Sequence, residues 1–579
     1  MVAWTLAAIL LLTVLAAAWI GVRGFLAYGH LTAAQDAAAE VTENLDDPAA
    51  AATAIDRISA DTAAARALTS DPIWQGAESV PWIGPQLSAV ATVTAAVDDV
   101  AGSALRPLAD VASSFSLDAL RPQDGAIDVS LFRTLAPAAR TGADGIAAAA
   151  ASVDSIDTTA LLAPLRTPIE DTGALLHSAT DGADALARAS ELLPTMLGAD
   201  GPRTYLVVFQ NNAEWRSLGG IVGAMAVIST DGGRMSLVDQ GSSSDFKRFT
   251  ESVLPLPEEV AQVYGQRPGL FIQNVTQVPE FPLAAQLSQE MWARETGTRV
   301  DGVISLDPVA LSYLLAATGP VTLPTGDVLT SDNAVELLLN GVYQRYERPA
   351  DQDLFFEVAA ASVFQALSSG QADPTVMLEA LAQAGDERRL LLWNSDPAAQ
   401  AVLDGTTLQG GLPVTDADQT SFGVYLNDGT GSKMDYYLAA GTATAWCTDT
   451  EGGADAALTV TLRNDAPADA ASLPPYITGG GSYGVPVGVA RTLAYIYLPA
   501  GAELVAAKAA GASVVDGFGG GTDQGRQILT WPTDLAPGET ATLTIRVSTP
   551  QTATLQAALT PSVNALETSK LASACEIPQ

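Results

Sequence analysis

The sequence predicts a multidomain α+β protein with a membrane-anchored helical stalk or bundle, a central α/β domain and a C-terminal β-sandwich. Three observations predict this class: an apolar N-terminal run, an alanine-rich region with helical spacing, and a later change to strand patterns. These changes place the anchor at residues 1–23, the helical stalk or bundle at 24–200, the α/β domain at 201–439 and the β-sandwich at 440–579.

The anchor is predicted by Val2 to Val22, a run without one charged residue. About 20 apolar residues, rising about 1.5 Å each, match a hydrocarbon core of about 30 Å. The alternative is a cleaved signal peptide, for which Ala16 to Ala18 offers a cleavage site. Against it, the run is longer than a typical apolar signal segment and no basic residue precedes it. We therefore expect a single-pass protein of the cell membrane with the bulk of the chain extracytoplasmic.

Composition and rare residues limit the chemistry. The chain has 28 Lys and Arg against 65 Asp and Glu, a formal net charge of −37 that repels phosphate backbones and argues against a nucleic-acid partner. The two histidines, His30 and His177, are too few for zinc binding or for Ser-His-Asp catalysis. We expect no cofactor and no metal. The two cysteines, Cys447 and Cys575, predict a disulfide in an oxidising compartment, and two unrelated buried thiols are the alternative.

The region from Phe25 to about Leu197 is alanine-rich with short Pro and Gly breaks, which is typical of packed helices. Apolar side chains recur there at spacings of 3, 4 and 7, as in Leu162, Leu165, Ile169 and Leu176. The segment DPIWQGAESVPWIGPQL, Asp71 to Leu87, interrupts the alanine pattern. We interpret it as a packed turn between helices, with a ligand site as the alternative.

Strand patterns begin at Arg203. Thr204 to Gln210 and Gly219 to Thr230 predict two buried strands, and Asp301 to Pro324 predicts a strand, a helix that starts at Asp307-Pro308, and another strand. After Leu412 the strands are short and alternating, which predicts an antiparallel sandwich. Its segment LAPGETATLTIRV is typical of the last hairpin of an immunoglobulin-like module.

Several motifs together carry a family resemblance: FQNNAEWRSLGGIVGA, DGVISLDPVALSYLLAATGPV, LTSDNAVELLLNGVYQRYE and FGVYLNDGTGSKMDYYL, with the DPIW and VPWIGP turns. They closely resemble actinobacterial proteins of the domain-of-unknown-function family 4012, from about Asp71 to Leu438. The resemblance implies an N-terminally anchored, surface-facing envelope protein with no established activity.

The order of elements in the α/β domain is also similar to that of the LytR-CpsA-Psr glycopolymer transferases. That similarity implies that Arg216, Arg345 and Arg348 would hold a lipid-linked pyrophosphate and that Asp353 would help to hold a divalent metal. The sequence departs from the transferase pattern at two places. Gly219-Gly220 replaces an expected Ser-Asp, and SSSDFKR, Ser242 to Arg248, replaces a Pro-Arg-Asp turn. These departures argue against metal binding.

The ligand-binding candidates are polar or charged residues of the α/β domain: Asn211, Asn212, Glu214, Arg216, Asp245, Lys247, Arg248, Arg345, Arg348 and Asp353. We expect the segment Asn211 to Gly220 to line the main cleft and to face Arg345 and Arg348. The alternative is that Glu214 and Arg216 simply pair with each other. NDGTGSK, from Asn427 to Lys433, is interpreted as turn chemistry, and no catalytic residue is nominated.

These observations favour a membrane-tethered envelope protein that binds an envelope ligand or partner, such as a polysaccharide or lipid-linked glycan. The competing hypothesis is a transferase that acts on lipid-linked envelope polysaccharide.

Deletion of Val2 to Val22 should release a soluble, folded protein, because no other segment is long and apolar enough to hold a bilayer. Fractionation of cells, with alkaline washing of the membranes, measures this release. A shortened chain that stays embedded in the washed membranes would contradict the single anchor.

Overall fold

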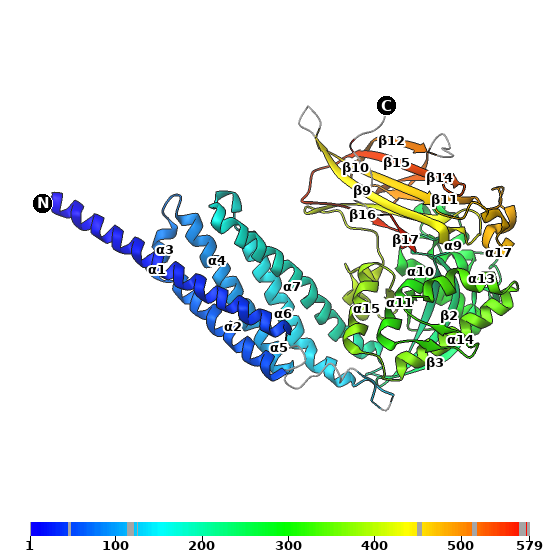
Figure 1. The fold of residues 1–579 in the computed structure, drawn as a ribbon, viewed down its shortest axis with the longest axis horizontal. Coiled ribbons are helices and arrows are strands. Elements are labelled where there is room, and N and C mark those ends of the chain that lie inside the picture. Colours follow the sequence, from blue (N-terminus) through cyan, green and yellow to red (C-terminus); the bar gives the residue numbers. More distant parts are fainter. Residues whose placement is uncertain are drawn as a thin grey trace. The chain divides into compact units, whose positions relative to one another are not determined.

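The computed structural model describes residues 2–43, 48–112, 121–123, 125–448, 454–511, 518–566 and 575 (Figure 1). The chain divides into two compact units, Met1–Gly201 (unit 1) and Pro202–Gln579 (unit 2). The mixed α/β class and the N-terminal apolar helix are confirmed.

Unit 1 is built from helices. They are α1 Val2–Glu43, α2 Pro48–Thr69, α3 Pro72–Glu78, α4 Gly84–Val100, a π-helical turn Ala101–Leu105, α5 Arg106–Ala112, α6 Val129–Asp154 and α7 Ala163–Met196. Within the described residues, α1 is the one helix that is long and apolar enough to cross a membrane. The side chains of its apolar part are exposed, for example Leu10 and Leu12.

Small side chains let the helices of unit 1 pack closely. One seam joins Ala89 and Val93 of α4 with Val153 of α6 and with Ile169 and Leu176 of α7. Leu162 does not belong to the expected seam, because it precedes the first turn of α7 and is 65% exposed. The segment DPIWQGAESVPWIGPQL forms α3, the turn after it and the start of α4.

The first part of unit 2 is a mixed five-stranded sheet in the order β3-β2-β1-β4-β7. Its strands are β1 Arg203–Asn211, β2 Ile221–Asp231, β3 Arg234–Ser242, β4 Gly302–Leu306 and β7 Leu391–Asn394. β1 pairs antiparallel with β2 and parallel with β4. A small two-stranded sheet, β5 Val321–Thr322 and β6 Val328–Leu329, lies apart from it.

Helices cover the mixed sheet. The helices of this part are α8 Glu258–Tyr264, α9 Arg267–Leu270, α10 Phe281–Thr296, α11 Pro308–Thr318, α12 Ala334–Glu336, a π-helical turn Leu337–Gly341, α13 Val342–Arg345, α14 Pro349–Ser368, α15 Pro374–Asp386 and α16 Pro397–Leu403. Leu206 and Val208 of β1 pack in one core with α10, and α11 and α14 contact β1, β2 and β3. The predicted start of α11 is confirmed: the Asp307 carboxylate accepts a hydrogen bond from the Ala310 amide, and Pro308 occupies the first turn.

The second part of unit 2 is a sandwich of two five-stranded sheets, in the orders β12-β15-β10-β9-β17 and β13-β14-β11-β8-β16. Its strands are β8 Gln419–Asp428, β9 Leu438–Thr448, β10 Ala454–Asn464, β11 Ala490–Tyr497, β12 Glu503–Gly511, β13 Gly519–Asp523, β14 Arg526–Leu535, β15 Thr540–Ser548, β16 Thr554–Leu559 and β17 Asn564–Ala565, with a short helix α17 Pro475–Thr478. One core joins Phe422 and Ile496 of one sheet to Leu458 and Ile545 of the other.

The sandwich does not begin at the expected residue 440. β8 pairs antiparallel with β11 and parallel with β16, so it lies inside a sandwich sheet. Its side chains are buried along nearly its whole length, and such a strand needs partners on both edges and cover on both faces. The more distant of these partners, β16, pairs with β8 at a separation of 135 positions in the chain.

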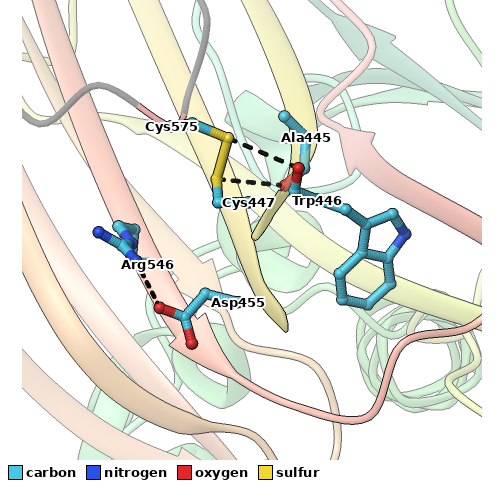
Figure 2. The surroundings of a disulfide bond; sticks show 6 residues. All are labelled: Ala445, Trp446, Cys447, Asp455, Arg546 and Cys575. Atoms are coloured by element: carbon cyan, nitrogen blue, oxygen red, sulfur yellow. Dashed lines mark hydrogen bonds and ion pairs between the residues drawn. A yellow bond between two sulfur atoms is a disulfide. The ribbon is translucent and has the colours of Figure 1, made fainter. Parts of the chain in front are cut away.

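A disulfide joins Cys447 of β9 to Cys575. Figure 2 shows the bond beside the backbone of Ala445 and Trp446, with the Arg546–Asp455 ion pair of the neighbouring strands nearby. Cys447 packs against Ala457 of β10. The bond therefore ties the last described residue of the chain to the interior of one sandwich sheet.

Replacing both cysteines, by Cys447→Ser and Cys575→Ser together, should lower the stability of unit 2 by about 2–5 kcal/mol, because the bond closes a loop of 128 residues. Thermal unfolding of the double variant beside the parent chain measures the loss. Thiol titration of the denatured, unreduced parent chain is the control, and a full count of two free thiols would contradict the bond.

Candidate functional site

The polar segment between β1 and β2, Asn211 to Gly220, is buried at every position. It starts where the apolar run of β1 ends, and it returns the chain to β2 through two glycines. Gly220 is required by close packing, because a Cβ atom there would lie 2.2 Å from the Asn211 carbonyl oxygen. The segment is therefore an internal loop, and its charged groups need internal partners.

Two cations share one carboxylate in this interior. The Arg216 guanidinium lies 3.1 Å from one Glu214 oxygen, and the Lys433 ammonium lies 2.5 Å from the other. Each of the three residues is at most 8% exposed. Arg216 also donates to the Asn274 side chain at 3.1 Å and to the Trp215 carbonyl at 2.7 Å. The Glu214 carboxylate thus holds together residues that lie 219 positions apart in the sequence.

Two further acids complete what we call the buried charge cluster: Glu214, Arg216, Asp428, Lys433 and Asp435. Asp428 is half-buried, and the other four residues are buried. Asp435 accepts a hydrogen bond of 2.7 Å from the Trp215 amide, and the Asp428 amide donates to the Trp215 carbonyl at 2.9 Å. These bonds fasten the loop after β1 to the segment after β8.

Burial and mutual charge set the ionisation of the cluster. Burial acts to raise the pKa of Glu214, but the charges of Lys433 and Arg216 lower it below its usual range. Burial and the Glu214 charge raise the pKa of Asp428 to about 6. Burial and the nearby Asp428 raise the pKa of Asp435 well above its usual value. The two cations therefore face one acid with a lowered pKa, Glu214, and two acids with raised pKa values, Asp428 and Asp435.

Amide side chains connect the same loop to the sheet. Asn212 donates to the Asp307 carboxylate at 2.9 Å, and Arg389 donates to the same oxygen at 2.7 Å. Gln210 donates to the Ser305 hydroxyl at 2.7 Å and accepts from the Gly220 amide. The Asp307 carboxylate therefore both caps the N-terminus of α11 and neutralises the Arg389 guanidinium.

A cavity of about 320 Å³ lies next to the buried charge cluster. Most of its wall is apolar: Phe209, Ile221, Val222, Ala224, Pro308, Leu311, Leu338, Leu339, Pro349, Phe356, Ala359 and Ala360. These residues come from β1, β2, α11, the π-helical turn 337–341 and α14. The cavity thus lies between the mixed sheet and the helices that contact it, and its volume is within the range of small-molecule sites.

One part of the cavity wall is polar. Lys433 lies 5.8 Å from the centre of the Tyr343 ring and 5.7 Å from the centre of the Tyr476 ring. Asn211 donates a hydrogen bond to the Tyr343 hydroxyl. Glu214 lines the cavity beside them. An ammonium between two aromatic rings and a carboxylate is held in one place, so this polar part of the wall is preorganised.

A second polar group lines the cavity at the end of β3. Ser242, Ser243 and Ser244 contribute to the wall, and the Ser244 hydroxyl donates to the Asp353 carboxylate of α14 at 2.8 Å. Asp353 is partly exposed. The bond connects the turn after β3 to the helix on the other side of the cavity.

The structure brings only some of the predicted site residues to the cavity. Asn211, Glu214 and Asp353 line it. The expected convergence of Arg216, Arg345 and Arg348 is wrong. Arg216 is buried against Glu214 behind the wall, and neither of the other two arginines lines the cavity.

Each of those two arginines has a local acidic partner instead. Arg345 pairs with Asp327 at 2.8 Å, and Arg348 pairs with Asp351 at 2.8 Å on the exposed surface. Each arginine thus has an acid close to it in the fold, and neither side chain extends to the loop that follows β1. None of the three arginines implied by the transferase resemblance is therefore among the residues that line this cavity.

The remaining candidates have structural positions outside the cavity wall. Asn212 is buried against Asp307. Asp245 closes a capping box with Ser242 at the turn Ser243–Asp245. Lys247 is exposed, and Arg248 lies over the Phe271 ring at 5.7 Å.

Sequence reasoning missed Lys433, Tyr343 and Tyr476 as cavity residues. Lys433 stands in NDGTGSK, where glycines and polar residues are typical of an exposed turn. The available signal was the LNDGTGSKMDYYL context, in which a single lysine and two aspartates lie between apolar strand residues. Charged residues so close to buried strands often pair with each other inside the fold.

Residues 200–343 match the model of a family described as "Protein of unknown function (DUF4012)". The match confirms the family resemblance over that segment, which includes β1, the buried loop and most of the elements that line the cavity. A comparison with curated proteins gives no match.

Arg216→Ala should reduce the free energy of unfolding of unit 2 by about 3–5 kcal/mol, because it leaves buried carboxylates without one of their two cations. Arg463→Ala is the matched control, because Arg463 pairs with Asp465 on the surface and its loss should cost less than about 1 kcal/mol. Denaturant unfolding of both variants measures the difference. Equal, small losses would contradict the buried charge cluster as a structural requirement.

Proposed function

We propose that this chain, which carries the DUF4012 segment, is a single-pass membrane-tethered protein whose unit 2 binds a small amphipathic ligand of the cell envelope. The observation that carries the proposal is the cavity between the mixed sheet and α11 and α14, apolar over most of its wall and bounded on one side by Lys433, Glu214 and Tyr343. Protein interiors are otherwise close-packed, and an apolar cavity of this size is unfavourable for water and favourable for an apolar group.

The charges of the cavity wall select the polar part of the ligand. Lys433 is the one cationic residue among the lining residues, and Glu214 already neutralises it. Asp353 adds a carboxylate whose described partner is a hydroxyl. A phosphate or pyrophosphate would meet no unpaired cation in this wall, whereas a hydroxyl, an amide or an amine could bond to the serines, tyrosines and acids. We therefore favour a neutral or cationic headgroup, and no observation favours the transferase.

Three further observations support the proposed location. α1 has the length and apolar character of a membrane span. The Cys447–Cys575 bond is of a type that persists in oxidising compartments. The net charge of −37 keeps the bulk of the chain away from anionic lipid surfaces. In this proposal the sandwich is an immunoglobulin-like module that supports the ligand-binding part of unit 2.

Gly223→Leu should expel the ligand from the cavity. Gly223 lines the wall, and a Cβ atom there would meet its nearest neighbour at an ordinary 3.9 Å, so a leucine side chain can extend into the empty space. We expect roughly tenfold less co-purified ligand, equivalent to about 1.4 kcal/mol of binding, with no loss of melting temperature because a cavity is filled.

The measurement is mass spectrometry of the molecules extracted from the purified full chain. Ser236→Leu, on the exposed side of β3, is the matched control, since both variants keep the same anchor and the same background of membrane lipids. A ligand present equally in the parent chain and in both variants would contradict binding in this cavity.

A further inference from the structure

Two turns meet at one end of unit 1. The first connects α2 to α4 and includes α3, and the second connects α6 to α7. The Gln86 side chain joins them, because it donates to the Ala160 carbonyl at 2.9 Å and accepts from the Leu162 amide at 3.0 Å. The two turns therefore form one continuous end of the helical unit.

This end lies beside α1 where its apolar run finishes. The Asp71 carboxylate, at the start of the first turn, pairs with Arg23 at 2.9 Å and accepts a hydrogen bond from Trp19 at 3.4 Å. Arg23 also donates to the Ala67 and Leu68 carbonyls of α2. Beyond these contacts α1 continues past α3 towards the N-terminus (Figure 1). These contacts place the two turns beside residues 19–23 of α1, at the same height along the helix axis.

Large apolar side chains are exposed on both turns. We call Ile73, Val80, Trp82, Ile83 and Leu162 the tip surface, and they are 46%, 45%, 90%, 55% and 65% exposed. Trp82 also has a φ of 74°, a conformation that non-glycine residues seldom adopt. Five such side chains on one end of a helical unit are more than scattered surface exposure explains.

We propose that the tip surface inserts into the interfacial layer of the same bilayer that α1 spans. The inference rests on the membrane anchoring of the proposed function. Val2 to Val22 measure about 31 Å along a helix, about the thickness of a hydrocarbon core. Because Asp71 contacts Trp19 and Arg23 at the end of that span, the turns lie at the boundary between lipid and water. Tryptophan is enriched at this boundary, where its ring is apolar and its N–H can bond to headgroups.

The charges near the tip surface indicate which lipid it meets. On the two turns Asp157 is exposed and Glu78 is half-buried. Arg23 is already paired with Asp71, and Arg166 donates to the Thr158 and Leu161 carbonyls. The contact is therefore apolar rather than electrostatic, and a zwitterionic phosphatidylcholine surface suits it better than an anionic one. Unit 1 would then contact the bilayer in two places, through α1 and through the tip surface. Together the two contacts would fix the direction in which α1 leaves the membrane.

The test places a fluorescent probe at the tip of the full chain in phosphatidylcholine nanodiscs. Trp82→Cys, labelled with an environment-sensitive dye, and Val80→Cys, which keeps Trp82, provide two positions. The native cysteines are bonded to each other and do not react. Ala38→Cys is the matched control, because it lies on an exposed side of α1 about 22 Å beyond Arg23.

Lipids that carry a nitroxide near the headgroup should quench most of the emission at positions 80 and 82 and none at position 38. A third probe, Leu10→Cys, tests the anchor with lipids that carry the nitroxide deep in the acyl chain. Quenching at position 10 without quenching at positions 80 and 82 would overturn the tip contact and leave the anchor intact. Absence of quenching at position 10 would overturn the anchor itself. A blue-shifted but unquenched probe at position 82 would mean that protein covers the tip surface, and this result also overturns the lipid contact.

Discussion

The pairing of Glu214 with Arg216 and Lys433 is the interaction on which the arrangement of unit 2 depends. A carboxylate and two cations cannot remain in a dry interior unless each has its partner. Glu214 and Arg216 come from the loop after β1, whereas Lys433 comes from the segment between β8 and β9. The electrostatic requirement therefore fixes the mixed sheet against the start of the sandwich.

The C-terminal part of the chain strengthens the same junction. The Thr560 hydroxyl donates to the Ser217 carbonyl at 2.9 Å and accepts from the Leu426 amide at 2.9 Å. Asn212 donates to the Pro561 carbonyl. Residues that follow the last long strand of the sandwich thus bond to the loop of the mixed sheet. This explains why the described residues from 202 onwards form one compact unit and not two.

In the proposed function, the same cluster limits which ligands suit the cavity. Lys433 lies at the cavity wall, but Glu214 neutralises its charge. The arginines that a pyrophosphate would need are paired with other acids, Arg216 with Glu214 and Arg345 with Asp327. The wall consequently combines a large apolar surface with neutralised polar groups, a combination that suits an amphipathic molecule without a phosphate. In unit 1, the ion pair between Asp71 and Arg23 also fixes two elements against each other. It sets the position along α1 of the turn that connects α2 to α4.

The sequence by itself determined the features that depend on local patterns: the apolar span of α1, the mixed α/β class, the start of α11 at Asp307-Pro308 and the family of residues 200–343. Each of these follows from the spacing or identity of neighbouring residues. Only the tertiary structure decided which charges meet, because any of 28 basic residues could pair with any of 65 acids. The spacing of residues along the chain could not show that Lys433 is the ion-pair partner of Glu214, or that Asp327 is the partner of Arg345. Strand order made that selection, since it brings Glu214 and Lys433, which are 219 positions apart in the chain, into contact.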